Sequence, residues 1–208
     1  MKTSNEKMFT KKDMTKMAVN AGALGMEYSW NYPRQMHLAF CMMIEKCLRK
    51  IYKDDPEGYA AALTRHVAFF NVTPQLAPFV GGIAVSMEEK VATGELEGAA
   101  VDSVKAALMG PLAGLGDAIV WVLLPTVLGA IAGYQAQNGS MFGTVLAVAV
   151  NIALWLVFWK LAYPVYKTGV TFITEKSASL RNLTEACSIL GIIVLGAMVA
   201  STVNVNIA

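Results

Sequence analysis

The chain has 208 residues, of which 55% are hydrophobic and only 15% are charged, whereas soluble domains carry about 25% charged residues. The formal net charge of +2 is too small to indicate a nucleic-acid partner. Residues 1–105 hold 13 of the 17 lysines and arginines, so the first half is the wetter one. This balance predicts an all-α integral membrane protein, with amphipathic, interfacial and re-entrant helices in residues 1–105 and about three transmembrane helices in residues 106–208.

The three cysteines, Cys41, Cys47 and Cys187, are an odd number and include no Cys-x-x-Cys pair. They therefore support neither a disulfide framework nor a zinc site, and we expect buried free thiols. Met1–Lys16 is dotted with charged residues where a signal peptide has its apolar core, which favours a cytoplasmic N-terminus.

The first predicted helix covers Thr10–Gly25. Thr10 is a suitable N-cap, and Asp13 stands at the third helical position, a variant of the capping box. Met14, Met17, Ala18, Ala21 and Leu24 share one helical face. Such a helix can lie among lipid headgroups or pack on the rest of the protein, and the sequence leaves both open.

Gly25–Arg34 crowds three aromatic residues, one acid, one amide and one arginine before and after a proline. Tyrosine and tryptophan suit the membrane interface, because each has a flat apolar body and a polar tip. The same mixture of ring faces and hydrogen-bonding groups also suits a sugar, so both an interfacial anchor and a ligand contact remain open.

Two further helices follow. Met36–Tyr52 is amphipathic, with cations at its C-terminal end, where they complement the helix dipole. Asp55 and Pro56 form the start of the next helix, which runs to Phe70. We expect the two histidines of the chain, His37 and His66, to be hydrogen-bonded structural groups.

Pro74–Met87 is apolar but only about 14 residues long, and it contains proline and a Gly-Gly pair. It is too short and too interrupted to cross a bilayer, which favours a re-entrant or interfacial segment. Glu88–Gly98 is then expected to be a solvated acidic turn, and Ala99–Leu108 a short helix ended by Gly110-Pro111.

The stretch Ala106–Trp159 carries one formal charge, Asp117. Its two apolar blocks, Ala118–Gly133 and Met141–Trp159, flank a polar break, so we expect a membrane-inserted helical hairpin with its turn in water. Lysines place Lys160–Arg181 in a cytoplasmic loop. Ala186–Val203 is a candidate for a third span.

The string Gly110–Asp117 is the main candidate site. Interrupted apolar segments point to a transport site, and Gly110 and Gly114 form a small-xxx-small pair that allows close helix packing. Asp117 is a functional candidate because burying it unpaired would be costly. Alternatively it caps a helix that starts at Ala118. The sequence has no phosphate-cradling loop, catalytic triad or metal cluster, so no catalytic residue, metal or cofactor is expected.

The chain resembles the IID membrane subunit of mannose-family sugar phosphotransferase systems over nearly its whole length. One matching string is Ser103–Asp117, and its Lys105–Asp117 part is the most specific part of the resemblance. The other matching strings are Asn31–Met36 with Leu48–Tyr52, Arg65–Pro74, Gly81–Lys90 and Thr184–Ala186. Family members usually continue for several tens of residues, so the resemblance also suggests a shortened chain.

The resemblance implies a multi-pass subunit of the bacterial inner membrane that pairs with a IIC subunit, several such pairs forming the assembly. The pair would carry a hexose or amino sugar inward, and cytoplasmic IIB, itself phosphorylated by IIA, would phosphorylate the sugar. IID would hold no phosphorylation site and would not be an enzyme by itself. The alternative is a non-transporting membrane scaffold that serves as a bacteriocin or phage receptor. The candidates for sugar binding or assembly are Asn31, Arg34, His66, Asn71, Thr73, Gly110, Pro111, Gly114, Gly116 and Asp117.

Overall fold

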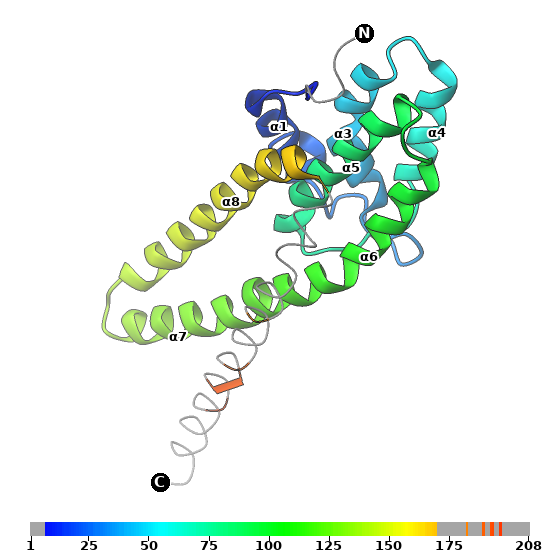
Figure 1. Cartoon of the computed structure of the whole chain (residues 1–208). Helices are drawn as coiled ribbons and strands as arrows, with labels where there is room; N and C mark the ends of the chain where they lie inside the picture. Colours follow the sequence, from blue (N-terminus) through cyan, green and yellow to red (C-terminus); the bar gives the residue numbers. More distant parts are fainter. Residues whose placement is uncertain (1–6, 170–181, 183–188, 190–191, 194–195, 197–208) are drawn as a thin grey trace. The chain divides into compact units, whose positions relative to one another are not determined.

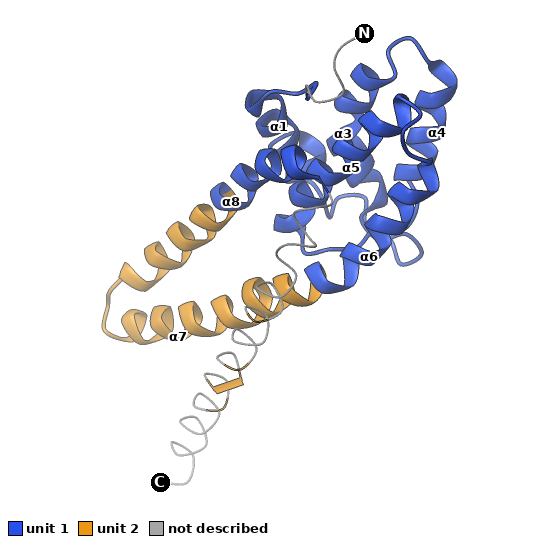
Figure 2. Cartoon of the chain, viewed as in Figure 1, with its two compact units in different colours: residues 1–112, 156–175 blue, residues 113–155, 176–208 orange. Residues whose placement is uncertain are grey.

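The computed structural model describes residues 7–169, 182, 189, 192–193 and 196, and the regular elements within them are helices (Figure 1). The chain divides into two units, one of residues 1–112 with 156–175 and one of residues 113–155 with 176–208 (Figure 2). We describe each by itself and call them unit 1 and unit 2. Most of the predicted third span, Ala186–Val203, lies outside the described residues.

Unit 1 begins with α1 (Lys11–Ala18) and α2 (Ala21–Leu24). The capping box of Thr10 and Asp13 is confirmed. The single helix predicted for Thr10–Gly25 is wrong, because Asn20 leaves the helical conformation and caps α2 through its side chain. Met14, Met17 and Ala18 are buried, so the apolar face of α1 packs on protein.

The predicted helix α3 (His37–Ile51) is confirmed. The helix α4 (Pro56–His66) and its Asp55 cap are also confirmed, but α4 ends four residues before Phe70, where its end was predicted. The apolar stripe of α3 is buried in the core of unit 1, where it packs against both α4 and α5.

The core of unit 1 is α5 (Ala77–Ala92), preceded by the short 3-10 turn η1 (Pro74–Leu76). The interruption predicted here is wrong. The proline falls in the first turn, where its missing N–H costs nothing. Gly82 admits a neighbouring helix, because a Cβ there would lie 2.5 Å from the carbonyl oxygen of Ala162. The helix also extends through Glu88, which is fully buried. The solvated turn predicted for Glu88–Gly98 is therefore wrong over Glu88–Ala92, which is helical.

The short helix predicted to end at Gly110-Pro111 is also wrong. The helix α6 (Gly98–Gly116) runs through Pro111 and passes into a π-helical segment, η2 (Asp117–Leu123), and then into α7 (Leu124–Gln137). Proline inside a helix removes one hydrogen bond without necessarily ending it, and π-helical turns absorb such register changes.

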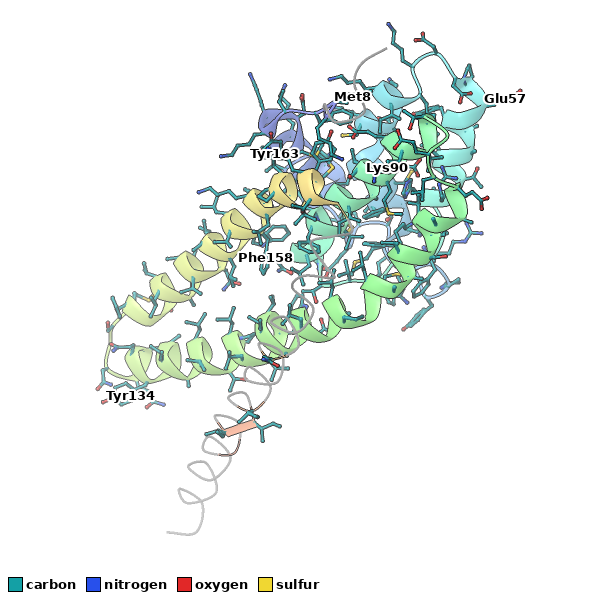
Figure 3. All side chains as sticks on the ribbon, in the orientation of Figure 1. Met8, Glu57, Lys90, Tyr134, Phe158 and Tyr163 are labelled. Carbon is teal, nitrogen blue, oxygen red and sulfur yellow. The ribbon has the colours of Figure 1, made fainter. Side chains whose placement is uncertain are left out.

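Unit 2 contains the predicted hairpin. A turn at residues 138–141 joins α7 to α8 (Phe142–Thr168), and Tyr134 lies in the last turn of α7 (Figures 2 and 3). Gly143 approaches the Ala132 backbone so closely that a Cβ would lie 2.5 Å from its Cα. The helix α8 continues nine residues past Trp159, so the loop predicted for Lys160–Arg181 is wrong over Lys160–Thr168, and residues 170–181 lie outside the described residues.

Two helical stretches among the described residues are long and apolar enough to cross a membrane, Gly98–Gln137 and Phe142–Thr168. In their most apolar windows only 22% and 6% of residues are buried. A core helix of a soluble protein would be mostly covered, so these uncovered faces fit lipid or a partner subunit.

Within unit 1, the last turns of α8 pack on the N-terminal segment. Phe9 donates its backbone N–H to the hydroxyl oxygen of Tyr166 at 3.0 Å, and that hydroxyl donates to the carboxylate of Glu89. Lys7 bonds Ser86 at 2.7 Å and lies 3.5 Å from Glu89. These contacts bind the start of the chain to α5 and α8.

Candidate functional site

The most concentrated polar site in the described residues is the buried carboxylate of Glu88, near the C-terminal end of α5. Arg65 donates from Nε and Nη2 to its two oxygens at 2.9 and 3.0 Å. His66 Nε2 lies 2.8 Å from Oε1, and the Tyr52 hydroxyl donates to Oε2 at 2.6 Å. We call these four residues the Glu88 cluster.

Local sequence places each member of the Glu88 cluster. Arg65 and His66 occupy the last turn of α4, where donor side chains are favoured next to a helix C-terminus. Tyr52 is the C-cap residue of α3. Glu88 stands one helical turn inside the end of α5, so three helices meet at a single carboxylate.

The Glu88 cluster holds its carboxylate ionised. Burial by itself would raise the pKa of Glu88, but the hydrogen bonds from His66, Arg65 and Tyr52 outweigh it and lower the pKa to about 2. Burial lowers the pKa of His66 below 6.5. The hydrogen bond with Glu88 acts against this shift, whereas the nearby cations add to it. Neutral His66 donates from Nε2, since a carboxylate only accepts.

A further cation next to the cluster, Lys105 on α6, is buried. Its Nζ donates to the backbone carbonyl of Arg65 at 3.0 Å and lies 5.5 Å from the ring centre of Phe40. Its ion pair with Asp102 is looser, at 3.8 Å. Lys105 thereby ties the start of an apolar candidate span to the end of α4.

Four of the predicted candidates come together at a different place in unit 1. The N–H of Arg34 donates to the side chain of Asn31 at 3.0 Å, and the Arg34 carbonyl accepts from Phe70 at 3.3 Å. The loop therefore lies beside the segment that carries Asn71 and Thr73. Asn71 donates its N–H to the Met109 sulfur at 3.2 Å, one residue before Gly110.

These four candidates differ in exposure. Thr73 is buried, whereas Arg34 is exposed and Asn31 and Asn71 are half-buried. They lie where the loop of residues 31–34, the segment after α4 and the helix α6 meet.

The glycine-rich string is helical throughout. Helical spacing places Gly110 and Gly114 on one face of α6, both exposed, and a Cβ at either meets no atom within 4 Å. Pro111 is exposed beside them, whereas Gly116 is buried.

The predicted cap at Asp117 is wrong. The residue before it is already helical, and no side-chain cap bond starts the π-helical segment. Asp117 lies inside a continuous helical run because the chain never leaves the helical conformation between Gly98 and Gln137. Its side chain is exposed within the chain.

Sequence reasoning identified His66 but missed Tyr52, Arg65, Glu88 and Lys105 as site residues. One signal was available: Arg65-His66 and Glu88 fall inside the strings that carry the family resemblance. Periodicity could not reveal them, because Glu88 follows an apolar run and resembles the first residue of a solvated turn. The described residues contain no group of three or more potential metal ligands.

The family model of the IID component of the mannose/fructose/sorbose family of phosphotransferase systems (EIID-AGA) matches residues 8–208. The chain belongs to this family. The resemblance predicted from the sequence is thus confirmed.

Individual relatives support the same family assignment. The chain is 34% identical over 209 residues to the mannose-specific EIID component of Escherichia coli (strain K12), covering 99% of this chain and 73% of that one. It is 32% identical over 207 residues to the fructose permease IID component of Bacillus subtilis (strain 168), covering 97% and 74%.

A solved structure has the same fold. The match is to a chain in the cryo-EM structure of the mannose transporter ManYZ with microcin E492 (MceA), with a TM-score of 0.71 and 33% identity, covering 93% of this chain and 71% of that one. IID components belong to sugar-transporting phosphotransferase systems of membranes, and the two apolar helices of this chain fit that setting.

Proposed function

We propose that this IID component pairs with a IIC subunit in the bacterial inner membrane and helps to carry a hexose or amino sugar into the cell. Cytoplasmic IIB, phosphorylated by IIA, would transfer the phosphoryl group to the sugar. The match over residues 8–208 carries this proposal. Relatives named for mannose, sorbose and fructose support a hexose-type substrate.

The uncovered helices support the pairing and a multi-pass topology. The α7–α8 hairpin presents large apolar side chains to its surroundings, among them Val145, Val148 and Ile152 on α8. In a bilayer these residues would contact lipid tails, and small residues would allow a second helix to approach closely. The exposed face of Gly110 and Gly114 is our candidate surface for IIC.

In this division of labour the chain is a non-catalytic permease subunit. The Glu88 cluster supports this assignment, because Arg65, His66 and Tyr52 all contact one buried carboxylate. A phosphoryl carrier would need a histidine nitrogen open to the cytoplasm, whereas His66 is fully buried. The cluster's role would be to hold α3, α4 and α5 in register.

The test is uptake of labelled hexoses and amino sugars in cells that supply IIC, IIB and IIA, with and without this chain. We expect uptake only when all are present. Uptake that is unaffected by deletion of this chain would overturn the proposal. Within the assay, Asp117→Ala should impair assembly or transport more than Glu95→Ala, a matched carboxylate removal in an exposed loop. Equal transport by the two variants would remove the case for Asp117.

A second candidate function is a scaffold that acts as a bacteriocin receptor. The similar ManYZ transporter was solved with a microcin. Gln135–Ser140, the end of α7 with the turn that follows it, is exposed at residues 136–139 and offers a contact. Binding of microcin E492 to cells carrying this chain, with no sugar flux on any hexose of the panel, would favour this second function.

A further inference from the structure

One surface of unit 1 is apolar and uncovered. Leu24, Tyr28 and Met42 line a cavity of about 310 Å³ together with small residues of α2 and α3. The Ala39 N–H donates to Ser29 Oγ at 3.1 Å at its edge. The surrounding large side chains are also exposed. We call the set the aromatic patch, which consists of Leu24, Tyr28, Trp30, Tyr32, Leu38 and Met42.

Exposure in the aromatic patch is high for residues of these types. Tyr28 is 92% exposed and Tyr32 83%, while Met42 is 58% exposed. Trp30 and Tyr32 meet edge to face with ring centres 4.8 Å apart. Soluble surfaces rarely carry contiguous apolar patches unless something covers them.

The exposed face of α3 is apolar in the first half of the helix and cationic in the second half. Leu38 and Met42 occupy its first two turns, and Lys46 and Arg49 follow on the same face, all four exposed. At 1.5 Å per residue, Leu38 and Arg49 are about 16 Å apart along the axis. The headgroup region on each side of the hydrocarbon core is only about 5–8 Å thick, so a helix inclined to the membrane plane can place Leu38 at acyl-chain depth and Arg49 in water.

We propose that the aromatic patch inserts into the membrane interface and that an acyl chain of a phospholipid occupies its cavity. The tyrosine and tryptophan rings would lie at headgroup level, and the cationic half of α3 would face anionic headgroups. Unit 1 is held near a bilayer by its own chain, because the first candidate span, Gly98–Gln137, begins within it and the second, Phe142–Thr168, ends within it. The inference rests on the proposed membrane topology.

The chemistry of the cavity separates a lipid from a sugar. A sugar ring presents hydroxyls on every edge and needs several donors and acceptors, whereas Ser29 is the one lining residue with a polar side chain apart from the Tyr28 hydroxyl. Ser29 Oγ already accepts a backbone hydrogen bond. An acyl chain needs no polar partner, and burying each of its methylenes is favourable by about 0.8 kcal/mol.

The experiment uses single-cysteine variants of the full chain, reconstituted with IIC in nanodiscs of zwitterionic and anionic phospholipid. Cys41 and Cys47 are buried and burial raises the pKa of both thiols, so they can be kept. Cys187 is replaced by serine. An environment-sensitive fluorophore is attached at Tyr28→Cys or Met42→Cys, with Glu57→Cys on the first turn of α4 (Figure 3) as the control and Val148→Cys as the membrane reference.

With lipids brominated on the acyl chain, labels at 28, 42 and 148 should lose intensity, whereas the label at 57 should keep its aqueous emission. Quenching at 148 without quenching at 28 or 42 would overturn the lipid proposal and leave the transport proposal intact. No quenching at any site would overturn both. Labels at 28 and 42 that respond only to added hexose, or only to the presence of IIC, would assign the patch to sugar or to protein instead.

Discussion

In unit 1 the buried charges find partners within the unit, whereas in unit 2 the hairpin helices leave most of their apolar side chains uncovered. The carboxylate of Glu88 has four donor atoms around it, and α5 is buried along most of its length. On α8 the reverse holds, since Val148 is 55% exposed and Ile152 equally so. The contrast teaches that unit 1 is organised by contacts inside the chain, whereas the hairpin leaves apolar faces that fit lipid or another subunit.

The largest expected effect comes from breaking the internal contacts of unit 1. Glu88→Ala leaves Arg65 nearly buried without its carboxylate, and such a loss typically costs about 3–5 kcal/mol. We expect a large fall in the thermal unfolding midpoint of the detergent-purified chain, or loss of the protein from membranes. The control is Glu95→Ala at an exposed position, with an expected change within about 0.5 kcal/mol. Equal stability of the two variants would mean that the Glu88 cluster does not hold unit 1 together.

Paired glycine substitutions sharpen the contrast between the two regions. At Gly82 a new Cβ would lie 2.5 Å from the Ala162 carbonyl, and backbone cannot yield cheaply. Gly82→Ala should therefore destabilise the isolated chain by about 1–3 kcal/mol. At Gly114 a new Cβ meets nothing within 4 Å, so Gly114→Ala should leave the unfolding midpoint unchanged but reduce the amount of IIC that copurifies. Normal recovery of IIC would remove Gly114 from the proposed interface.

The sequence predicted the helices whose signals are local. The Thr10–Asp13 capping box, the Asp55 cap and the apolar stripe of α3 are short-range patterns, and each is found in the structure. The hairpin was predicted because its two apolar blocks flank a polar turn. The family could be recognised from the Ser103–Asp117 string.

Tertiary context decided the features that the sequence missed. Pro78 and Pro111 predict breaks from the sequence, yet Pro78 lies in the first turn of α5 and Pro111 is tolerated inside α6. Glu88 looked like a solvated acid because its three partners lie 22 to 36 positions away in the sequence. No single-residue pattern records such distant hydrogen bonds, so the carboxylate's burial could not be predicted.

A smaller effect is expected in the pH dependence of stability. The pKa of His66 is lowered below 6.5 by burial, so the unfolded chain binds more protons and stability falls as the pH drops below about 6.5. The pKa of Glu88, lowered from 4.5 to about 2, makes stability fall further below about pH 4.5. In His66→Gln the decline between pH 7 and pH 5 should be shallower, while profiles above pH 7.5 stay parallel. An unchanged slope in unfolding midpoints would show that His66 titrates alike in both states.

The smallest effect concerns the contact between the N-terminal segment and α8. Tyr166→Phe removes the hydroxyl that accepts from Phe9 and donates to Glu89, and because one such hydrogen bond typically contributes about 1 kcal/mol, we expect a loss of that size. Tyr163→Phe is the matched control, one turn earlier on α8 (Figure 3), because its hydroxyl has no hydrogen bond among the described residues. Limited proteolysis should cut the segment before Thr10 faster in Tyr166→Phe alone. Equal cutting in both variants would mean that the hydroxyl does not hold the N-terminal segment against α8.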